Sequence, residues 1–483
     1  MTDAIMGIDL GTTEVKAGLV RPDGSLLGIA RAGYGLEVGH GPGWAEQDPG
    51  SWWSAVVGAV RALHLTAATD GIDVVAIGVD GHGPTLVPVD SRGEATRPAI
   101  TFLDTRSAAE AAELEAATGV GGWGLGPLPA ALWMERHEPA TAATTRWYLT
   151  TWEWLAFRLT GEAVAPLVAH QITPDPGRAA AATGLRVDRR PPEGAMGAVV
   201  GQLSDSAAAA LGLRRGIPVA GGTNDAFASY LGAGLLEPGD AYDPGGSAGG
   251  FGVYWDRPLD VPGAFVSPAP LEGRYSVGAA MAATGRAFDW FRDEVIDGAM
   301  TTERLIDEAG ATAPGANGLV FLPYLAGERS PIWDPSATGV LAGLTLAHGR
   351  GHIARAIMEA SALALRHVSA PMLAAGVRVT AMRTCGGPAR SDTWNQIKAD
   401  VTGFRVLVPA VLETAVLGSA ILGSVGVAIH PDTRTAIRAM TRIDHELAPR
   451  PDMSGVYDRT YAAYTALYPA IAPVLRPLTD SAS

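Results

Sequence analysis

Cysteine and clustered positive charge are scarce in this 483-residue chain. Its single cysteine, Cys385, excludes a disulfide framework and a cysteine-based zinc site. Lysine and arginine number 36 against 50 aspartates and glutamates, so the formal net charge is −14. Surfaces that bind nucleic acid or anionic membranes need clustered positive charge, so the sequence predicts neither kind of partner.

Long hydrophobic runs are missing as well. Asp3, Asp9, Glu14 and Lys16 interrupt any apolar signal core in the first twenty residues. The uncharged stretch 414–429 is broken by glycine and is shorter than the roughly 20 residues of a membrane-spanning helix. Apolar residues make up 47% of the chain and charged residues 18%, which suits a large buried core. We expect a soluble, cytoplasmic protein of two or three domains.

Strands and helices are predicted to alternate along the chain. Residues 5–8, 15–20 and 25–32 read as strands, with a hairpin turn at Asp23-Gly24. Asp48-Pro49 is typical of a helix start, and apolar residues follow at helical spacing. The apolar segments 74–79, 217–220 and 318–322 indicate buried strands. This alternation predicts an α/β fold.

Two glycine turns have a similar layout. Segments 9–13 and 243–247 each place an acid, one further residue, glycine and small residues ending in a hydroxyl. Such turns offer N–H and hydroxyl donors to phosphate oxygens, and Asp9 suits a hydrated Mg²⁺. The similarity indicates two related halves that meet near residues 235–239. Chance similarity, and an ordinary hairpin at 9–13, are the open alternatives.

Asp225 stands at a predicted strand-to-helix junction. A strand at 217–220 precedes a predicted flexible turn at 221–224, and residues 226–231 read as a helix. A carboxylate at this place faces the end of the sheet, where open α/β folds bind ligands, and could accept a proton from a substrate hydroxyl. A plain helix N-cap is the alternative interpretation.

Other polar clusters follow predicted strands. Gly81 and His82 come after strand 74–79, and Asp104 and Arg106 come after residues 100–103, so both groups could hydrogen-bond a polyol. A structural role is the alternative for each. The glycine-rich segment 385–391 follows a strand-like run at 377–382 and would let a flat ring or a phosphate approach the backbone closely.

Together these motifs resemble the FGGY family of carbohydrate kinases. The most specific stretch is 339–344 followed, after seven residues, by 352–359, which is similar to the C-terminal signature of that family. Segment 9–13 resembles its first phosphate motif, 245–247 its second, and 386–391 its adenosine motif. The resemblance implies a two-domain, actin-like ATPase (ribonuclease H-like) α/β fold with duplicated β-sheet cores and an interdomain cleft. Residues 1–236 would form the sugar-binding domain and residues 237–483 the nucleotide-binding domain.

The resemblance further implies ATP-dependent phosphorylation of a sugar or polyol hydroxyl, with Mg²⁺. Asp225 would be the general base, and Asp9 would help to place the metal. Positioning and charge neutralisation dominate phosphoryl transfer, and closure of the domains would exclude water. Substrate contacts would fall on Gly81, His82, Asp104, Arg106, Asn224 and Asp225. ATP contacts would fall on Gly11, Thr12, Thr13, Lys16, Gly246, Ser247, Gly285, Gly386, Gly387 and Ser391.

Within the family, the N-terminal half is most similar to xylulose kinases, so a ketose such as D-xylulose is the expected substrate. Gly81 stands where those enzymes carry methionine, Gly246 replaces a usual threonine, and the segment 170–190 is shortened. These departures keep open another polyol or an aldonate as substrate, or a catalytically inactive sugar- or nucleotide-binding protein. A chaperone-like or actin-like ATPase is a third reading. Dimers are common in the family, so a homodimer stays open.

Overall fold

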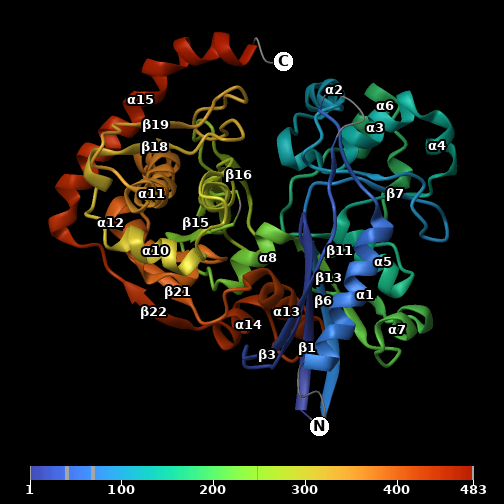
Figure 1. The fold of residues 1–483 in the computed structure, drawn as a ribbon. Helices are drawn as coiled ribbons and strands as arrows, with labels where there is room; N and C mark the ends of the chain where they lie inside the picture. Colours follow the sequence, from blue (N-terminus) through green and yellow to red (C-terminus); the bar gives the residue numbers. More distant parts are fainter. Residues whose placement is uncertain (1, 39–42, 67–70, 247, 481–483) are drawn as a thin grey trace. The chain divides into compact units, whose positions relative to one another are not determined.

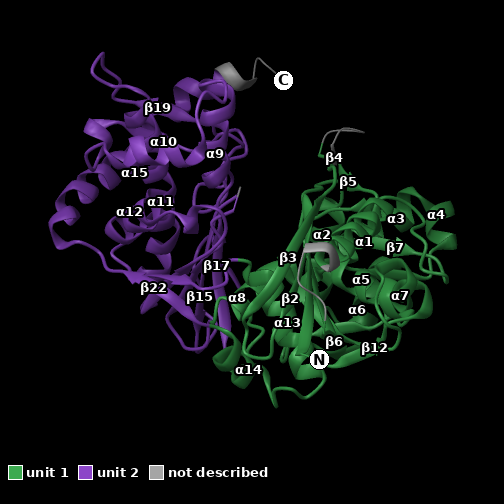
Figure 2. Ribbon diagram, turned by 60° about the horizontal axis from the view of Figure 1, so that its bottom comes forward, with its two compact units in different colours: residues 1–234, 267–273, 413–441 green, residues 235–266, 274–412, 442–483 purple. Residues whose placement is uncertain are grey.

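Two compact units make up the chain (Figures 1 and 2). The computed structural model describes residues 2–38, 43–66, 71–246 and 248–480. Unit 1 comprises Met1–Gly234, Ser267–Gly273 and Glu413–Thr441, and unit 2 comprises Leu235–Val266, Arg274–Leu412 and Arg442–Ser483. The chain first passes between the units at Gly234, but two later segments return to unit 1. The single division predicted at residue 236 does not include these returns.

Unit 1 is built on a six-stranded sheet with the order β12-β13-β6-β1-β2-β3. Its strands are β1 (Thr2–Leu10), β2 (Glu14–Val20), β3 (Leu26–Gly33), β6 (Ile72–Gly81), β12 (Val199–Gln202) and β13 (Pro218–Asn224). Smaller pairings join β4 (Glu37–Val38), β5 (Ala45–Gln47) and β8 (Ala99–Ile100), β7 (Val87–Val89) and β9 (Trp147–Leu149), and β10 (Ala165–Leu167) and β11 (Glu193–Ala195). Its helices are α1 (Pro49–Thr66), α2 (Ala108–Thr118), α3 (Leu128–His137), α4 (Pro139–Thr144), α5 (Thr151–Thr160), α6 (Pro176–Thr183), α7 (Asp205–Leu211), α8 (Asp225–Gly232), α13 (Thr414–Gly426) and α14 (Thr433–Met440).

Unit 2 contains a seven-stranded sheet with the order β16-β17-β15-β14-β20-β21-β22. Its strands are β14 (Asp240–Asp243), β15 (Gly250–Trp255), β16 (Phe265–Pro268), β17 (Tyr275–Ala280), β20 (Ala381–Thr384), β21 (Val406–Pro409) and β22 (Ile443–Leu447), and β18 (Val320–Leu322) pairs separately with β19 (Val340–Ala342). Its helices are α9 (Thr284–Trp290), α10 (Thr302–Gly310), α11 (Arg350–Ala374), α12 (Asp392–Thr402) and α15 (Ser454–Asp480).

The two sheets share one topology, which confirms the predicted duplication. In unit 1, β1 pairs antiparallel with β2 and parallel with β6, and β6 pairs parallel with β13. In unit 2, β14 pairs antiparallel with β15 and parallel with β20, and β20 pairs parallel with β21. The register places Asp9 opposite Asp80 in the first sheet and Asp243 opposite Thr384 in the second. Asp9 and Asp243 therefore occupy equivalent positions.

The predicted turn at 221–224 is wrong, because β13 continues through Asn224. A register shift against β6 falls between Ala220 and Thr223. A Cβ at Gly222 would lie 2.1 Å from the carbonyl oxygen of Val79, so glycine at this position permits close approach of the two backbones. Another boundary also differs, since the strand expected at 377–382 is β20 and begins at Ala381.

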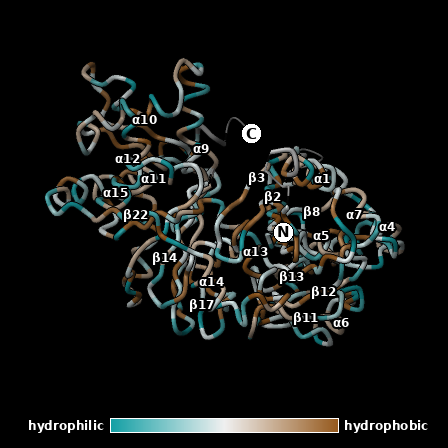
Figure 3. The backbone as a smooth tube through the Cα atoms, turned by 90° about the horizontal axis from the view of Figure 1, so that it is seen from below, coloured by the Kyte–Doolittle hydropathy of each residue, from teal (hydrophilic) through white to brown (hydrophobic). Residues whose placement is uncertain are grey.

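Helices cover both faces of the sheet in unit 1. Figure 1 shows α1 and α5 on one face and α13 on the other. Every residue of α13 from Thr414 to Ser424 is buried, and Figure 3 shows hydrophobic segments among β2, β13 and α13. A Cβ at Gly78 would lie only 1.8 Å from the carbonyl oxygen of Ser419, so this helix packs directly on the strand backbone. The uncharged stretch that begins at Thr414 is helical as far as Gly426.

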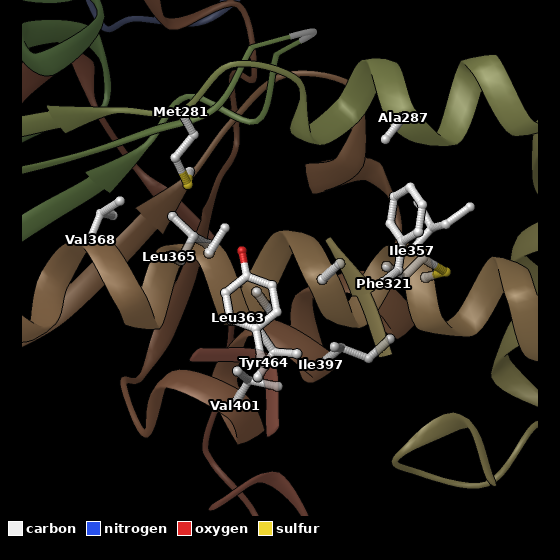
Figure 4. Close-up of a cluster of buried hydrophobic side chains, with 14 of the residues drawn as sticks. Met281, Ala287, Phe321, Ile357, Leu363, Leu365, Val368, Ile397, Val401 and Tyr464 are labelled. Atoms are coloured by element: carbon white, nitrogen blue, oxygen red, sulfur yellow. The ribbon is translucent and has the colours of Figure 1, made fainter. Parts of the chain in front are cut away.

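In unit 2 the long helix α11 runs through the hydrophobic core. Figure 4 shows Leu365 of α11 beside Met281, and Ile397 and Val401 of α12 in the same cluster. None of the helices in the described part of the chain combines the length and apolar character needed to cross a membrane.

Candidate active site

The candidate active site of unit 1 lies where three parallel strands end. Asp9 is the next-to-last residue of β1, and Asp80 lies opposite it on β6. Asn224, the last residue of β13, pairs with Gly81. Asp225 follows Asn224 directly. Because the carboxyl ends of parallel strands meet at one edge of a sheet, residues far apart in the sequence come together here, at the usual ligand-binding edge of open α/β sheets.

Asp225 is the first residue of α8, and it does not cap the helix. The N-cap is Asn224, whose side-chain oxygen accepts a hydrogen bond of 2.8 Å from the N–H of Phe227. Asp225 Oδ1 accepts the N–H of Ala226 at 2.7 Å, and the side chain is partly exposed. The N-cap interpretation of Asp225 is therefore wrong, and this carboxyl group is available for another role.

The surroundings of Asp225 favour its protonated form. Burial among protein atoms, followed by the negative charge of Asp9, raises the pKa of Asp225 to about 7, although the Ala226 N–H and Lys16 oppose the rise. A general base works best when its pKa lies close to the working pH. The geometry and the pKa thus suit proton transfer at neutral pH.

Asp9 and Asp80 form a buried pair of carboxyl groups. Lys16 Nζ lies 3.4 Å from Asp9 Oδ2, and the hydroxyl of Ser419 donates to Asp80 Oδ2 at 2.5 Å. Burial, followed by the charge of Asp9, holds the pKa of Asp80 well above its usual range. Asp80 Oδ1 is buried and has no hydrogen-bond partner in the described residues.

These carboxyl groups fit a magnesium ion. Mg²⁺ keeps several waters and takes only one or two carboxylates from a protein, and a cation would relieve the repulsion between Asp9 and Asp80. The described ranges contain no group of three or more His, Cys, Asp or Glu side chains that could form an all-protein metal site. The donors therefore match a hydrated Mg²⁺ better than an enclosed metal centre.

The turn at 11–13 presents the N–H groups of Thr12 and Thr13 outward, whereas the N–H of Gly11 donates to the carbonyl of Glu14 at 3.1 Å. The carbonyl of Gly11 accepts the hydroxyl of Tyr34, the carbonyl of Thr12 accepts Gln47 Nε2 at 2.8 Å, and the carbonyl of Thr13 accepts the N–H of Tyr34 at 3.0 Å. In a trans peptide the N–H points opposite to the carbonyl. The N–H groups of Thr12 and Thr13 therefore point away from these partners, as a phosphate cradle requires.

His82 follows Gly81, the last residue of β6. Its ring is buried, lies 3.2 Å from the Thr85 hydroxyl through Nδ1, and packs edge-on against Trp52 at 5.3 Å. Burial lowers the pKa of His82 to about 3, so the ring is neutral at physiological pH. Its buried Nε2 has no hydrogen-bond partner in the described part of the chain, and the same holds for Trp152 Nε1. Both nitrogens suit contact with a hydroxyl group.

Gly81 has no room for a side chain. A Cβ there would lie 2.4 Å from the Thr151 hydroxyl, which itself donates to the carbonyl of His82 at 2.5 Å. Thr151, at the start of α5, therefore fills the space beside Gly81. A direct side-chain contact from position 81 to a substrate is impossible, so only its backbone is available.

Asp104 and Arg106 belong to a buried charge network. Asp104 accepts the N–H groups of Ala45 and Arg106, and it accepts the Arg106 guanidinium at 2.8 and 2.6 Å. A carboxylate has about four acceptor sites, so these four donors fill Asp104. A sugar hydroxyl would have to displace one of them. The structure thus favours Asp104 as the residue that holds Arg106 over the predicted direct contact with substrate.

Arg106 retains an open donor within this network. Its guanidinium lies over the ring of Trp44 at 3.6 Å and near that of Trp133 at 4.9 Å, and Nη2 also contacts Glu46 at 2.7 Å. Its buried Nη1 has no hydrogen-bond partner within the described residues. Arg106 is therefore rigidly placed and can still donate one hydrogen bond.

In unit 2 the predicted nucleotide motifs lie together. A Cβ at Gly386 would lie 2.8 Å from the carbonyl oxygens of Pro244 and Gly245, so the two glycine turns touch. A small pocket beside them is lined by Asp243, Gly245, Met281, Thr284, Gly285, Ser361, Leu365, Pro388, Trp394 and Lys398. Gly246 and Gly387 adjoin these turns, whereas Ser247 lies outside the described residues.

Ser391 has a structural task in this region. Its side chain caps α12 by accepting the N–H of Trp394 at 3.2 Å. A hydroxyl also donates, so contact with a nucleotide is compatible with this role and stays a prediction. The sequence did not single out Ser419, Thr151 or Lys398, because their roles arise only when distant segments pack together.

The duplicated sheets, with a carboxylate-rich strand edge in one unit and paired glycine turns in the other, define an actin-like ATPase fold with a kinase-type site. Residues 4–170 match the N-terminal domain and residues 246–427 the C-terminal domain of the FGGY family of carbohydrate kinases. The chain belongs to this family, whose members transfer phosphate from ATP to a sugar.

Individual relatives agree with this assignment. The xylulose kinase of Bacillus subtilis is 30% identical over 425 residues, which cover 83% of this chain and 84% of that protein. The gluconokinase of Bacillus licheniformis is 26% identical over 86% of each chain. The crystal structure of xylulose kinase from Rhodospirillum rubrum matches with a TM-score of 0.82 and 32% identity, covering 98% of this chain and all of that one.

Substitution of Arg106 by methionine tests the charge network. We expect Arg106→Met to lower the free energy of unfolding by about 3–5 kcal/mol, because Asp104 stays buried without its cation, whereas Glu46 keeps Arg97. Denaturant unfolding measures the change. Arg136→Met is the matched control, since Arg136 makes a two-bonded pair with Glu113 in solvent and its loss should leave unfolding nearly unchanged. Equal effects of the two variants would contradict the network.

Proposed function

We propose that this carbohydrate kinase phosphorylates a neutral ketose such as D-xylulose, with Asp225 as the general base. The observation that carries the proposal is the Asp225 carboxyl group, which is relieved of capping by Asn224 and has a pKa of about 7. A base of this kind collects the proton of the acceptor hydroxyl as phosphoryl transfer proceeds.

The charges of unit 1 favour a neutral substrate over an aldonate. Burial and the charge of Asp9 raise the pKa of both Asp80 and Asp225, which shows that further negative charge is disfavoured here, and the His82 ring stays neutral. Lys16 already faces Asp9, Glu14 and Glu413 at 3.4–4.0 Å. Among the described residues, Arg106 Nη1, Trp152 Nε1 and His82 Nε2 are buried and unpartnered, and Arg106 is the one cation of the three, so these groups suit neutral hydroxyls.

The remaining predicted residues take the nucleotide. The outward N–H groups of Thr12 and Thr13 would bind phosphate oxygens, as would the turn at Gly245-Gly246. Gly285, Gly386, Gly387 and Ser391 would hold the rest of ATP, and Asp9 with Asp80 would hold Mg²⁺. When bound, Mg²⁺ neutralises phosphate charge.

A substrate panel tests the proposed class. We expect ADP release with Mg-ATP to be fastest with a ketose, slower with reduced polyols and slowest with aldonates, because the anionic strand edge repels a carboxylate. A coupled assay across the panel, with the phosphorylated product identified by mass, measures the order. If an aldonate were the best substrate, the neutral-ketose proposal would be wrong. If none of the sugars gave a phosphorylated product, the proposed kinase activity would be wrong.

Removal of the base is the second test. Asp225→Asn should lower kcat by about 10²–10⁴-fold while ADP still binds, because the carboxylate acts on the acceptor proton. Asp205→Asn is the matched control, since Asp205 also follows an N-cap, Ser204, at the start of α7 but is exposed to solvent. Transfer that persists within about tenfold of wild type would contradict the role of Asp225.

The pH profile is the third test. The raised pKa means that Asp225 becomes protonated, and so inactive as a base, as the pH falls through about 7. We expect kcat/KM for the sugar to decline below that pH by about tenfold per unit. Steady-state rates between pH 5 and 9 with saturating Mg-ATP measure this decline in kcat/KM. A rate that stays constant down to about pH 5, near the ordinary carboxyl range, would contradict the assignment.

A further inference from the structure

A buried ion pair lies beside the glycine turns of unit 2. Lys398 of α12 donates from Nζ to Asp243 Oδ2 and, at 2.8 Å, to the Thr384 hydroxyl. Thr384 in turn contacts Asp243 Oδ2 at 3.1 Å. Asp243 is 3% exposed and Lys398 is 2% exposed. A lysine so deeply buried loses most of its hydration, so its charged form is stable only beside such partners.

The same carboxylate holds the glycine turn. Asp243 Oδ1 accepts the N–H of Gly245 at 3.0 Å, and the carbonyl of Asp243 accepts the N–H of Cys385 at 3.1 Å. Asp243 and Lys398 both line the small pocket that also contains Gly245 and Gly285. Asp243 therefore links Lys398 to the turn proposed to bind phosphate.

Comparison of the two sheets shows what Lys398 changes. Asp9 of unit 1 faces a second acid, Asp80, whereas the equivalent Asp243 of unit 2 faces Thr384. In unit 2 a buried lysine also neutralises the remaining acid. With Lys16 included, which lies 3.4 Å from Asp9, the strand end of unit 1 holds two acids and one lysine, whereas that of unit 2 holds one acid and one buried lysine where phosphate is proposed to lie.

We infer that Lys398 is a positioning residue for the nucleotide. It neutralises Asp243, so that Asp243 can orient the turn at Gly245 without presenting a buried negative charge to the phosphates. This inference rests on the proposed function, because it takes the turn at Gly245-Gly246 as a phosphate-binding element.

Two single variants, each of which removes the charge of one member of the ion pair, test the inference. Lys398→Met leaves the buried Asp243 carboxylate without a neutralising cation and should weaken ADP binding by about tenfold or more. Asp243→Asn keeps an oxygen for the Gly245 N–H and leaves a cation, so ADP should bind as tightly as to wild type or more tightly. Titration calorimetry with Mg-ADP on the full chain measures both. A merely structural pair would weaken binding in both variants, and that result would overturn the inference.

The double variant and a control complete the design. Asp243→Asn with Lys398→Met removes both charges and should recover most of the affinity that Lys398→Met loses, which keeps the test open if the single lysine variant folds poorly. Arg355→Met is the control, because it removes a buried cation from Glu359, 2.7 Å away in the same unit, outside the pocket lining. Loss of ADP affinity in the control, or no recovery in the double variant, would overturn the inference.

Kinetics give a second readout. Lys398→Met should raise the KM for ATP while leaving the KM for the sugar unchanged, and general destabilisation would not separate the two constants in this way. Failure of wild type to bind Mg-ADP would reject the proposed nucleotide site itself. Tight wild-type binding with unchanged affinity in Lys398→Met would reject only the role of Lys398.

Discussion

The register between β1 and β6 is the constraint on which the acceptor side of this enzyme depends. It places two acids, Asp9 and Asp80, opposite each other at the end of a buried sheet. Like charges at this spacing cannot both ionise at low cost, so the pair favours a shared proton or a bound cation. The field of Asp9 also reaches Asp225 and helps to bring its pKa to about 7. One strand pairing thus places two acids at the edge of the sheet and adds to the effect of burial on the pKa of Asp225.

Gene duplication is a natural source of the two sheets. Their later divergence explains why the equivalent strand ends now differ in charge. Both repeats retain an acid at the end of their first strand. In unit 1 the surrounding residues preserve negative charge, with Ser419 donating to Asp80. In unit 2 a threonine and a lysine remove it. The two sheets have the same backbone arrangement. Side chains from later helices, Ser419 of α13 and Lys398 of α12, determine the charge at each strand end.

Sequence patterns predicted the elements that depend on local chemistry. The hairpin at Asp23-Gly24 and the helix after Asp48 both follow from turn residues and apolar spacing. The bulge at Gly221-Gly222 looked like a turn, because glycine serves turns and close backbone contacts alike. The filled carboxylate of Asp104 and the ion pair of Lys398 join segments distant in the sequence, and no local pattern marks such partners. The family resemblance supplied the roles, and the packing showed which side chains are free to perform them.

Helix α13 has a consequence for biosynthesis. It covers one face of the first sheet, yet it is encoded by residues 414–426, near the end of the chain. During translation the N-terminal strands emerge long before the helix that buries Gly7 and Gly78 against its backbone. Unit 1 therefore completes its core only after residues 414–426 have been synthesised, and until then its exposed sheet face is a surface that chaperones would need to shield. The strand ends that carry Asp9 and Asp80 are in this way stabilised by a helix that is synthesised long after them.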